Sequence, residues 1–509
     1  MLKKILAILI VFSVLLPVLA GCSGGGGDTK PAPPGGDGDA QDVSDRADST
    51  ENAAERFVPD VPDMDFGGYE FRAFVPTNNM YASFTFAVEE DTGDTLNDAI
   101  FKRNKYIENK YNVVFKQSEL EDFWLMTDMF KRSVMSGSDD YDVSSQFYGW
   151  NLALQGYTLP ADALPHADMT KPWYMHDLNE VYSIGNRCFV AYSDEYMCAY
   201  DVRTVLCFNK NLIKDLALEN PYDLVKAGAW THDRFFDMCR AASADIDGDG
   251  KMTDRDRYGI LSQYDELLSP FWVCSEVKTV VKDLEGMLVL NLAGNERLFS
   301  ILDKIHLNIY GGEKILFDTH PQSGDKVTSY QADKINISGF IDVSRQQFEN
   351  NSGLFLTARL VTIPNLRAMD ADFGILPYPK ADENQQKYYA FAAESWPRVV
   401  PSNAPNPERT GIILEALAAE SRNTVIPAYK ETCLKTKFAR DDESLGMLDI
   451  IFDNVVVDLG TIVFWESIRN TLIEEARKKG NFVSVVEKQY AKFEKLVNEV
   501  NNSVGKSIE

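Results

Sequence analysis

From Tyr69 onward, the chain alternates short strand-like segments with longer amphipathic segments. The stretch YEFRAFVP is followed by TLNDAIFKRNKYIENKY and then by YNVVFKQS, which predicts a strand, a helix and a second strand. Residues 372–380, DFGILPYPK, predict another strand, and a long segment near the C-terminus has apolar residues at helical spacing. Alternating strands and helices are typical of sheets that carry helices on their faces. The sequence therefore predicts an α/β fold.

Composition and motifs exclude some classes of function. The 509 residues are 45% hydrophobic, enough for one large or two medium-sized cores. The net charge of −26 would repel a phosphate backbone, so we expect no nucleic-acid partner. The chain has no P-loop or HExxH motif, and its GxSxG match, GCSGG at residues 21–25, lies in a glycine-rich stretch and not between a strand and a helix. Its five histidines show no metal-ligand spacing, which favours a protein that is not an enzyme. A surface glycan hydrolase stays open, because a carboxylate pair is recognised only in space.

The N-terminus has the pattern of an export signal. Lys3 and Lys4 precede an apolar run at residues 5–20, which is shorter than the roughly 20 residues of a membrane span. The following LAGC, residues 19–22, resembles the bacterial lipobox, whose cysteine is lipidated and becomes the mature N-terminus. The resemblance implies a signal peptide at residues 1–21, a palmitate-type lipid anchor on Cys22, and attachment to the outer face of the cytoplasmic membrane.

Residues 22–56 hold almost no large apolar side chains, so we expect a lipidated, flexible tether. Six cysteines follow Cys22, without CxxC pairs and among apolar neighbours. Buried free thiols are the favoured interpretation, and disulfide pairing remains the alternative. The six are Cys188, Cys198, Cys207, Cys239, Cys274 and Cys433.

The segment ADIDGDGKMTDRDRYGI has the spacing of a calcium-binding loop. Oxygen ligands fall at the first, third, fifth, seventh, ninth and twelfth positions, and Gly250 supplies the turn at the sixth. The predicted ligands are Asp245, Asp247, Asp249, the carbonyl of Lys251, Thr253 and Asp256. Aspartate at the twelfth position predicts modest affinity. A helix before the loop and a strand after it predict a structural calcium site, not a sensor.

Several segments, taken in order behind the lipobox, resemble the extracellular solute-binding proteins of ABC importers, in their carbohydrate-associated group. The resemblance covers residues 65–502 and rests on VLCFNKNLI, GAWTHDRFFDMCRAA, the calcium loop, DADFGILPYPK and TVIPAYKETCLKTKFARDDES. It implies a two-lobed, periplasmic-binding-protein-like fold with hinge crossovers and a central ligand cleft. The implied N-terminal lobe spans residues 57–195 and 400–430, and the C-terminal lobe spans 196–399 and 431–509. The crossovers are expected near 192–203, 394–401 and 424–436.

The resemblance also implies a function. We expect a monomeric, lipid-anchored receptor that captures a sugar or oligosaccharide and delivers it to an ABC permease; a receptor for a non-sugar solute is the alternative. Trp150 and Trp465 lie in stretches similar to those that carry sugar-stacking tryptophans in the maltose-binding members of this family, and Trp396 and Tyr192 lie at expected crossovers. Core packing is the alternative for all four, and it is favoured for Trp396 and Tyr192.

Overall fold

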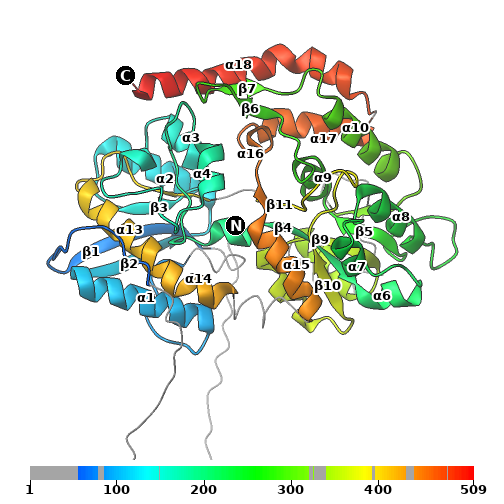
Figure 1. Cartoon of the computed structure of the whole chain (residues 1–509), viewed down its shortest axis with the longest axis horizontal. Coiled ribbons are helices and arrows are strands. Elements are labelled where there is room, and N and C mark those ends of the chain that lie inside the picture. Colours follow the sequence, from blue (N-terminus) through cyan, green and yellow to red (C-terminus); the bar gives the residue numbers. More distant parts are fainter. Residues whose placement is uncertain are drawn as a thin grey trace, which may run out of the picture. The chain divides into compact units, whose positions relative to one another are not determined.

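The computed structural model describes residues 56–77, 85–147, 149–319, 325, 340–392, 396–430, 441–478 and 480–508 (Figure 1). These residues belong to one compact unit, Glu55–Glu509. The predicted signal peptide, Cys22 and Cys433 lie outside the described residues, as does nearly all of the predicted tether. None of the helices in these ranges has both the length and the apolar character that a membrane crossing requires.

The first sheet has four strands in the order β12-β3-β1-β2 (Figure 1, left). Strand β1 (Tyr69–Pro76) pairs in parallel with β2 (Val113–Leu120) and β3 (Val143–Ser145), and β12 (Arg398–Val399) runs antiparallel to β3. Helix α1 (Thr95–Tyr111) joins β1 to β2. Its Asp94 cap accepts two backbone N–H bonds, and Asn112, with φ of 49°, ends the helix one residue before β2. Local sequence thus sets the first βαβ unit.

The second sheet has five strands in the order β10-β4-β9-β5-β8 (Figure 1, right). Strand β5 runs parallel to β9 and β8, while β4 runs antiparallel to β9 and β10. All of β4 is buried, because helices cover both faces of this sheet. The strand bounds are β4 Thr204–Asn209, β5 Tyr258–Ser262, β8 Leu316–Asp318, β9 Gly353–Arg359 and β10 Phe373–Leu376.

Two further strand pairs and the remaining helices complete the described fold. The label η marks a 3₁₀-helix (η2, η4) or a π-helix (η3, η6). Strands β6 (Val280–Lys282) and β7 (Leu288–Leu290) pair antiparallel, and β11 (Ala390–Phe391) and β13 (Val455–Val456) pair in parallel. The helices are α2 Phe123–Ser136, α3 Gly149–Leu154, η2 Ala161–Ala163, α4 His176–Tyr182, α5 Cys198–Asp201, α6 Lys210–Asp215, α7 Pro221–Lys226, α8 His232–Ala242, α9 Tyr264–Val273, α10 Glu296–Ile305, η3 His306–Tyr310, α12 Phe340–Glu349, η4 Leu360–Ala368, α13 Pro407–Asn423, α14 Val425–Pro427, α15 Asp442–Asp453, α16 Leu459–Ile462, η6 Trp465–Arg469, α17 Asn470–Lys478 and α18 Phe482–Ile508.

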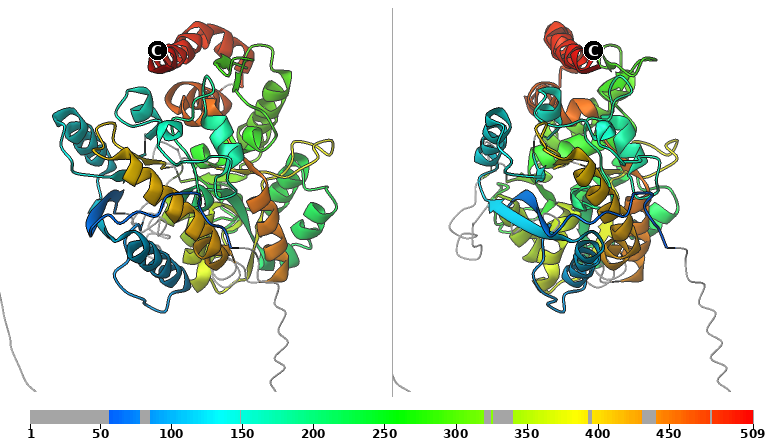
Figure 2. Two further views of the ribbon diagram at one scale, coloured as in Figure 1. Left: turned by 60° about the vertical axis from the view of Figure 1, so that its left-hand side comes forward. Right: turned by 90° about the vertical axis from the view of Figure 1, so that its left-hand side faces the viewer.

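The prediction of an α/β fold is confirmed, and the chain passes between the two sheets as the two-lobe plan requires. It leaves the first sheet after β3, enters the second at β4, returns at β12, and reaches the second again where α15 packs on β10. One boundary needs correction: β12 pairs with β3, so Arg398 and Val399 belong to the first sheet and not to the predicted range 196–399. Helix α18 contacts both β7 and α3, and it lies at one edge of the molecule in both views of Figure 2.

Five of the six cysteines after Cys22 are described, and all five are buried free thiols. Burial raises the pKa of Cys198 and of Cys207 to about 12, so both stay protonated near neutral pH. The favoured interpretation, that the cysteines are buried thiols packed with apolar neighbours, holds for these five.

Candidate functional site: a cleft between the two lobes

A cavity of about 690 Å³ is lined by α2, which joins β2 to β3, by α3, which follows β3, and by residues from the C-terminal part of the chain. Helices α2 and α3 form one side, residues 463–467 form the opposite side, and α18 adds Lys492 and Leu496. This volume falls within the range of ligand-binding clefts. The described lining residues are Trp124, Thr127, Asp128, Lys131, Asn151, Leu152, Gln155, Val463, Phe464, Trp465, Glu466, Ser467, Lys492 and Leu496.

Trp124 belongs to this cavity, although the sequence analysis did not select it. Asp122 caps α2 and accepts the backbone N–H of Trp124 and of Leu125, which sets the start of the helix. Asp128 and Lys131 follow at helical spacing and line the same cavity. The Trp124 residue is 56% exposed, which is unusual for so large an aromatic residue. The signal that could have identified it is an aromatic residue at helical spacing with the polar residues Asp128 and Lys131.

Trp465 lies on the opposite side of the same cavity. It is the first residue of η6, and it is partly buried. The guanidinium carbon of Arg469, one turn later, lies 5.3 Å from the centroid of the ring. The role of Trp465 in sugar stacking stays a prediction, but its position is suitable for it.

Trp150, Tyr192 and Trp396 lie in the hydrophobic core. Trp150 is 6% exposed, and its Nε1 donates to the carbonyl of Tyr182 at 3.2 Å. The ring of Tyr192 packs against the ring of Tyr182 at a tilt of 38°, with 5.1 Å between the centroids. Trp396 is 7% exposed and lies 4.9 Å from the Phe147 ring. This burial favours the core-packing alternative for all three residues, while the neighbour of Trp150, Asn151, lines the cleft.

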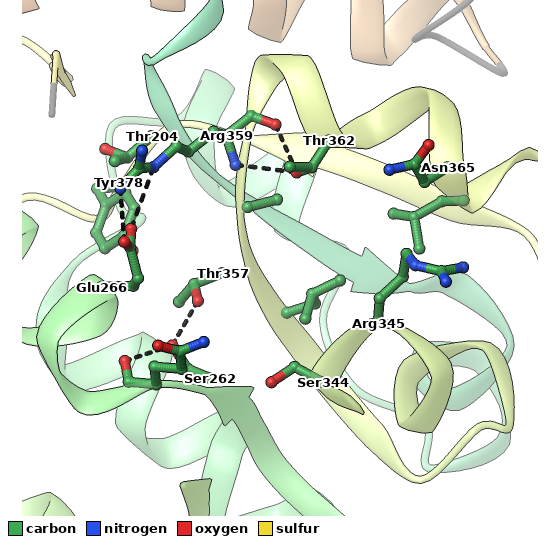
Figure 3. A pocket seen from close by; sticks show the side chains of 14 residues that line it. Thr204, Ser262, Glu266, Ser344, Arg345, Thr357, Arg359, Thr362, Asn365 and Tyr378 are labelled. Atoms are coloured by element: carbon green, nitrogen blue, oxygen red, sulfur yellow. Dashed lines mark hydrogen bonds and ion pairs between the residues drawn. The ribbon is translucent and has the colours of Figure 1, made fainter. Parts of the chain in front are cut away.

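A second, smaller pocket of about 70 Å³ lies at one edge of the five-stranded sheet (Figure 3). Because β5 and β9 are parallel, both end at this edge, at Ser262 and Arg359. Strand β4 runs antiparallel to β9 and therefore begins there, at Thr204. The carboxyl ends of strands are the common place for ligands in open α/β sheets.

Polar side chains of this sheet-edge pocket form ion pairs and hydrogen bonds with one another. The Arg359 guanidinium forms a two-point ion pair with Glu266 of α9, with Nη2–Oε1 at 2.5 Å and Nε–Oε2 at 3.3 Å. The hydroxyls of Ser262 and Thr357 hydrogen-bond to each other (Figure 3). Burial raises the pKa of Tyr378 well above its usual range, so its hydroxyl stays neutral. These groups can bind hydroxyls, and no local motif predicted them, because they come from distant segments.

The calcium loop lies between α8 and β5, as the sequence predicted. The carboxylate oxygens of Asp245, Asp247 and Asp249 lie within 4.8 Å of one another. Asp245 accepts the backbone N–H groups of Gly248 and Gly250, each at 2.7 Å, which folds the loop around the three acids. Both glycines have positive φ, of 72° and 80°, which glycine adopts at little cost.

Asp256, at the twelfth loop position, binds the backbone of the loop. Asp256 is 1% exposed and accepts the backbone N–H of Ile246 and of Thr253. Burial would raise the pKa of Asp256, but these hydrogen bonds outweigh it and hold the pKa below its usual range. The three converging carboxylates of Asp245, Asp247 and Asp249 fit a hard cation such as calcium, whereas Asp256 is not part of that group. Lys251 is exposed and Thr253 half-buried, and the calcium site stays a prediction.

Comparisons with known proteins agree on the fold. No protein-family model matches the chain, and neither does the sequence of any curated protein. A cyclo/maltodextrin-binding protein complexed with maltotetraose superposes with a TM-score of 0.54 at 13% identity, over 86% of this chain and 97% of that one. The GacH receptor of Streptomyces glaucescens, solved unliganded and with acarbose, superposes with a TM-score of 0.52 at 12% identity, over 84% and 99%. The chain therefore has the two-lobed fold of the periplasmic-type solute-binding proteins, as the resemblance implied.

Proposed function

We propose that this protein is a receptor that captures a sugar or oligosaccharide in its interlobe cleft and delivers it to an ABC permease. The observation that carries the proposal is the pair Trp124 and Trp465, which line one cavity from its two sides. Exposed aromatic faces suit the apolar faces of pyranose rings, and Asp128, Asn151 and Glu466 supply acceptors and donors for hydroxyls. The two superposed proteins bind maltotetraose and acarbose, which are carbohydrates.

Removing either cleft tryptophan is expected to weaken sugar binding while the fold survives. Trp124→Ala and Trp465→Ala should each cost about 1–3 kcal/mol of binding free energy, or roughly tenfold to a hundredfold in affinity. Isothermal titration with maltotetraose, acarbose and the tightest sugar from a thermal-shift panel measures the effect. Leu125→Ala is the matched control, because Leu125 lies on α2, is 42% exposed and is not among the cavity-lining residues. If both tryptophan variants bind sugar as tightly as the unsubstituted protein, the two tryptophans do not belong to the binding site.

A glycan hydrolase is the second candidate, because the cleft contains the carboxylates of Asp128 and Glu466. Incubation of the protein with a labelled oligosaccharide separates the two functions: a receptor returns the sugar intact, while a hydrolase shortens it. Binding of a peptide in the same titrations, without binding of any sugar, would instead support the non-sugar receptor.

The proposal includes attachment to the membrane. Cys22 would carry the lipid, and the residues up to about 56 would let the body reach away from the outer face of the membrane. The described body begins close to α13: the backbone N–H of Phe57 donates to the Asn423 side chain at 2.9 Å, and Arg56 pairs with Glu420. Mass spectrometry of the mature N-terminus tests the lipid directly.

We propose that the loop at residues 245–256 binds calcium and stabilises the α8–β5 connection. Asp245→Ala should lower the melting temperature in calcium and abolish the further fall that a chelator causes, because a cation that binds only the folded state stabilises it. Differential scanning calorimetry with and without chelator measures both effects. Asp283→Ala is the control, since Asp283 also accepts backbone N–H groups in a tight turn, at the β6–β7 hairpin. If the unsubstituted protein melts identically in calcium and in chelator, the loop holds no calcium.

A further inference from the structure

Asp458 is a fully buried carboxylate one short helix, α16, before the segment that forms one side of the cleft. It is the N-cap of α16, and both of its oxygens are used. Oδ1 accepts the backbone N–H of Thr279 at 2.8 Å and of Val280 at 3.4 Å. Oδ2 accepts the Thr279 hydroxyl at 2.7 Å, and the N–H and hydroxyl of Thr461 at 3.1 and 2.6 Å. One side chain thus ties the start of β6 to the first turn of α16.

The surroundings of this carboxylate leave little room for α16 to move. A Cβ on Gly460 would lie 1.9 Å from the Thr279 hydroxyl, so α16 packs directly on the residue that Asp458 binds. The Thr461 hydroxyl also accepts Nε1 of Trp272, from α9, at 3.3 Å. Helix α16 is therefore fixed at two places on the C-terminal lobe, by hydrogen bonds that are shielded from water.

The position of α16 determines the position of Trp465. The backbone N–H groups of Val463 and Phe464 both donate to the carbonyl of Leu459, so η6 follows α16 without a flexible connection. Residues Val463–Ser467 then line the cleft, whereas Asp458 is not among its lining residues. On the other side, residues 455–457 and Leu459 line a separate cavity of about 500 Å³, beside α4. Residues 455–467 therefore line two separate cavities.

We propose that Asp458 is a positioning residue for the cleft: it holds α16 on Thr279, so that Trp465 keeps its ring toward the ligand space. The link to sugar binding rests on the proposed function, whereas the mechanical link between Asp458 and Trp465 does not. Replacing the carboxylate by a methyl group leaves five donors without their acceptor, and local opening of α16 should follow. Asparagine can keep the acceptor for Thr279 N–H and Val280 N–H, but it loses the acceptor for Thr461 N–H.

The test compares Asp458→Ala, Asp458→Asn and the matched control Asp441→Ala. Asp441 is likewise an N-cap aspartate, of α15, and accepts Ser444 N–H at 2.6 Å, but neither it nor α15 lines the cleft. Acrylamide quenching of Trp465 is obtained as the difference between each variant and the same variant carrying Trp465→Phe. Hydrogen exchange of residues 459–469 is followed by mass spectrometry. Neither measurement uses a ligand.

In Asp458→Ala we expect the Trp465 quenching constant to rise about twofold, and exchange in residues 459–469 to accelerate about tenfold, while the protein remains folded. Asp458→Asn should lie between this variant and the unsubstituted protein. Asp441→Ala should lower the melting temperature but change neither readout. Unchanged quenching and exchange in Asp458→Ala would show that Asp458 caps α16 without positioning Trp465, and would overturn the proposal. If Asp458→Ala does not fold, unchanged values in Asp458→Asn overturn it. Failure of the unsubstituted protein to bind any sugar would overturn the proposed function alone.

Discussion

Trp150→Ala is expected to lower the free energy of unfolding by about 3–5 kcal/mol, the usual cost of deleting a buried tryptophan side chain. The 6% exposed residue lies in the large apolar cluster that includes Leu178, Tyr182 and Phe493, and its indole N–H is bonded to a backbone carbonyl. Removing the ring therefore leaves a cavity and a carbonyl without its donor. Urea denaturation measures the loss.

Two comparisons make this prediction specific. Trp150→Phe should recover most of the stability, because the phenyl ring fills much of the space and only the hydrogen bond is lost. Trp465→Ala should cost only about 1 kcal/mol of stability, because that ring is partly exposed at the cleft. Near-native stability of Trp150→Ala together with weakened sugar binding would support the stacking role that the sequence suggested for Trp150.

His232→Phe is expected to remove an acid-dependent loss of stability. His232 is fully buried at the first turn of α8, 4.9 Å from the Phe271 ring, with its Nε2 3.3 Å from the Ser275 hydroxyl. Burial, followed by the positive charges of Lys304 and Arg297, lowers the pKa of His232 to about 3. In the unfolded chain, the pKa of histidine is about 6.5.

The sign of the effect follows from these two pKa values. Above pH 6.5 the histidine is neutral in both states and imposes no penalty. As the pH falls from about 6.5 toward 3, only the unfolded chain takes up the proton, so the free energy of unfolding falls by about 1.4 kcal/mol per pH unit. The loss attributable to His232 should reach about 2 kcal/mol at pH 5 and about 3 kcal/mol at pH 4.

The experiment compares the pH dependence of unfolding in the original protein and in His232→Phe. The difference between the two curves isolates the histidine, because burial raises the pKa of Asp194, Glu415 and Asp458, and those carboxylates contribute with the opposite sign in both proteins. His232→Phe keeps an aromatic ring against Phe271 and does not titrate. Parallel curves between pH 7 and pH 4 would show that His232 takes up a proton as readily in the folded protein as in the unfolded chain, which contradicts the lowered pKa.

Local sequence determined those features that depend on neighbours in the chain. The apolar alternation of Tyr69–Pro76 and the helical period of Thr95–Tyr111 specify one βαβ unit, because strand and helix periods differ and Asp94 and Asn112 mark the helix ends. The acidic loop was found between a helix and a strand for the same reason: its carboxylates and glycines lie within twelve consecutive residues, and short loops fold on themselves.

Only the tertiary structure distinguished a tryptophan in the core from one at the cleft. Trp150 and Trp465 had equal standing in the sequence, yet Trp150 is buried and hydrogen-bonded to the Tyr182 carbonyl, while Trp465 lines a cavity. Trp124 was overlooked, because exposure depends on what distant segments leave uncovered. The Arg359–Glu266 pair joins residues 93 positions apart. Periodicity records which face of an element is buried; which faces meet, and which stay open to a ligand, depends on packing between elements far apart in the chain.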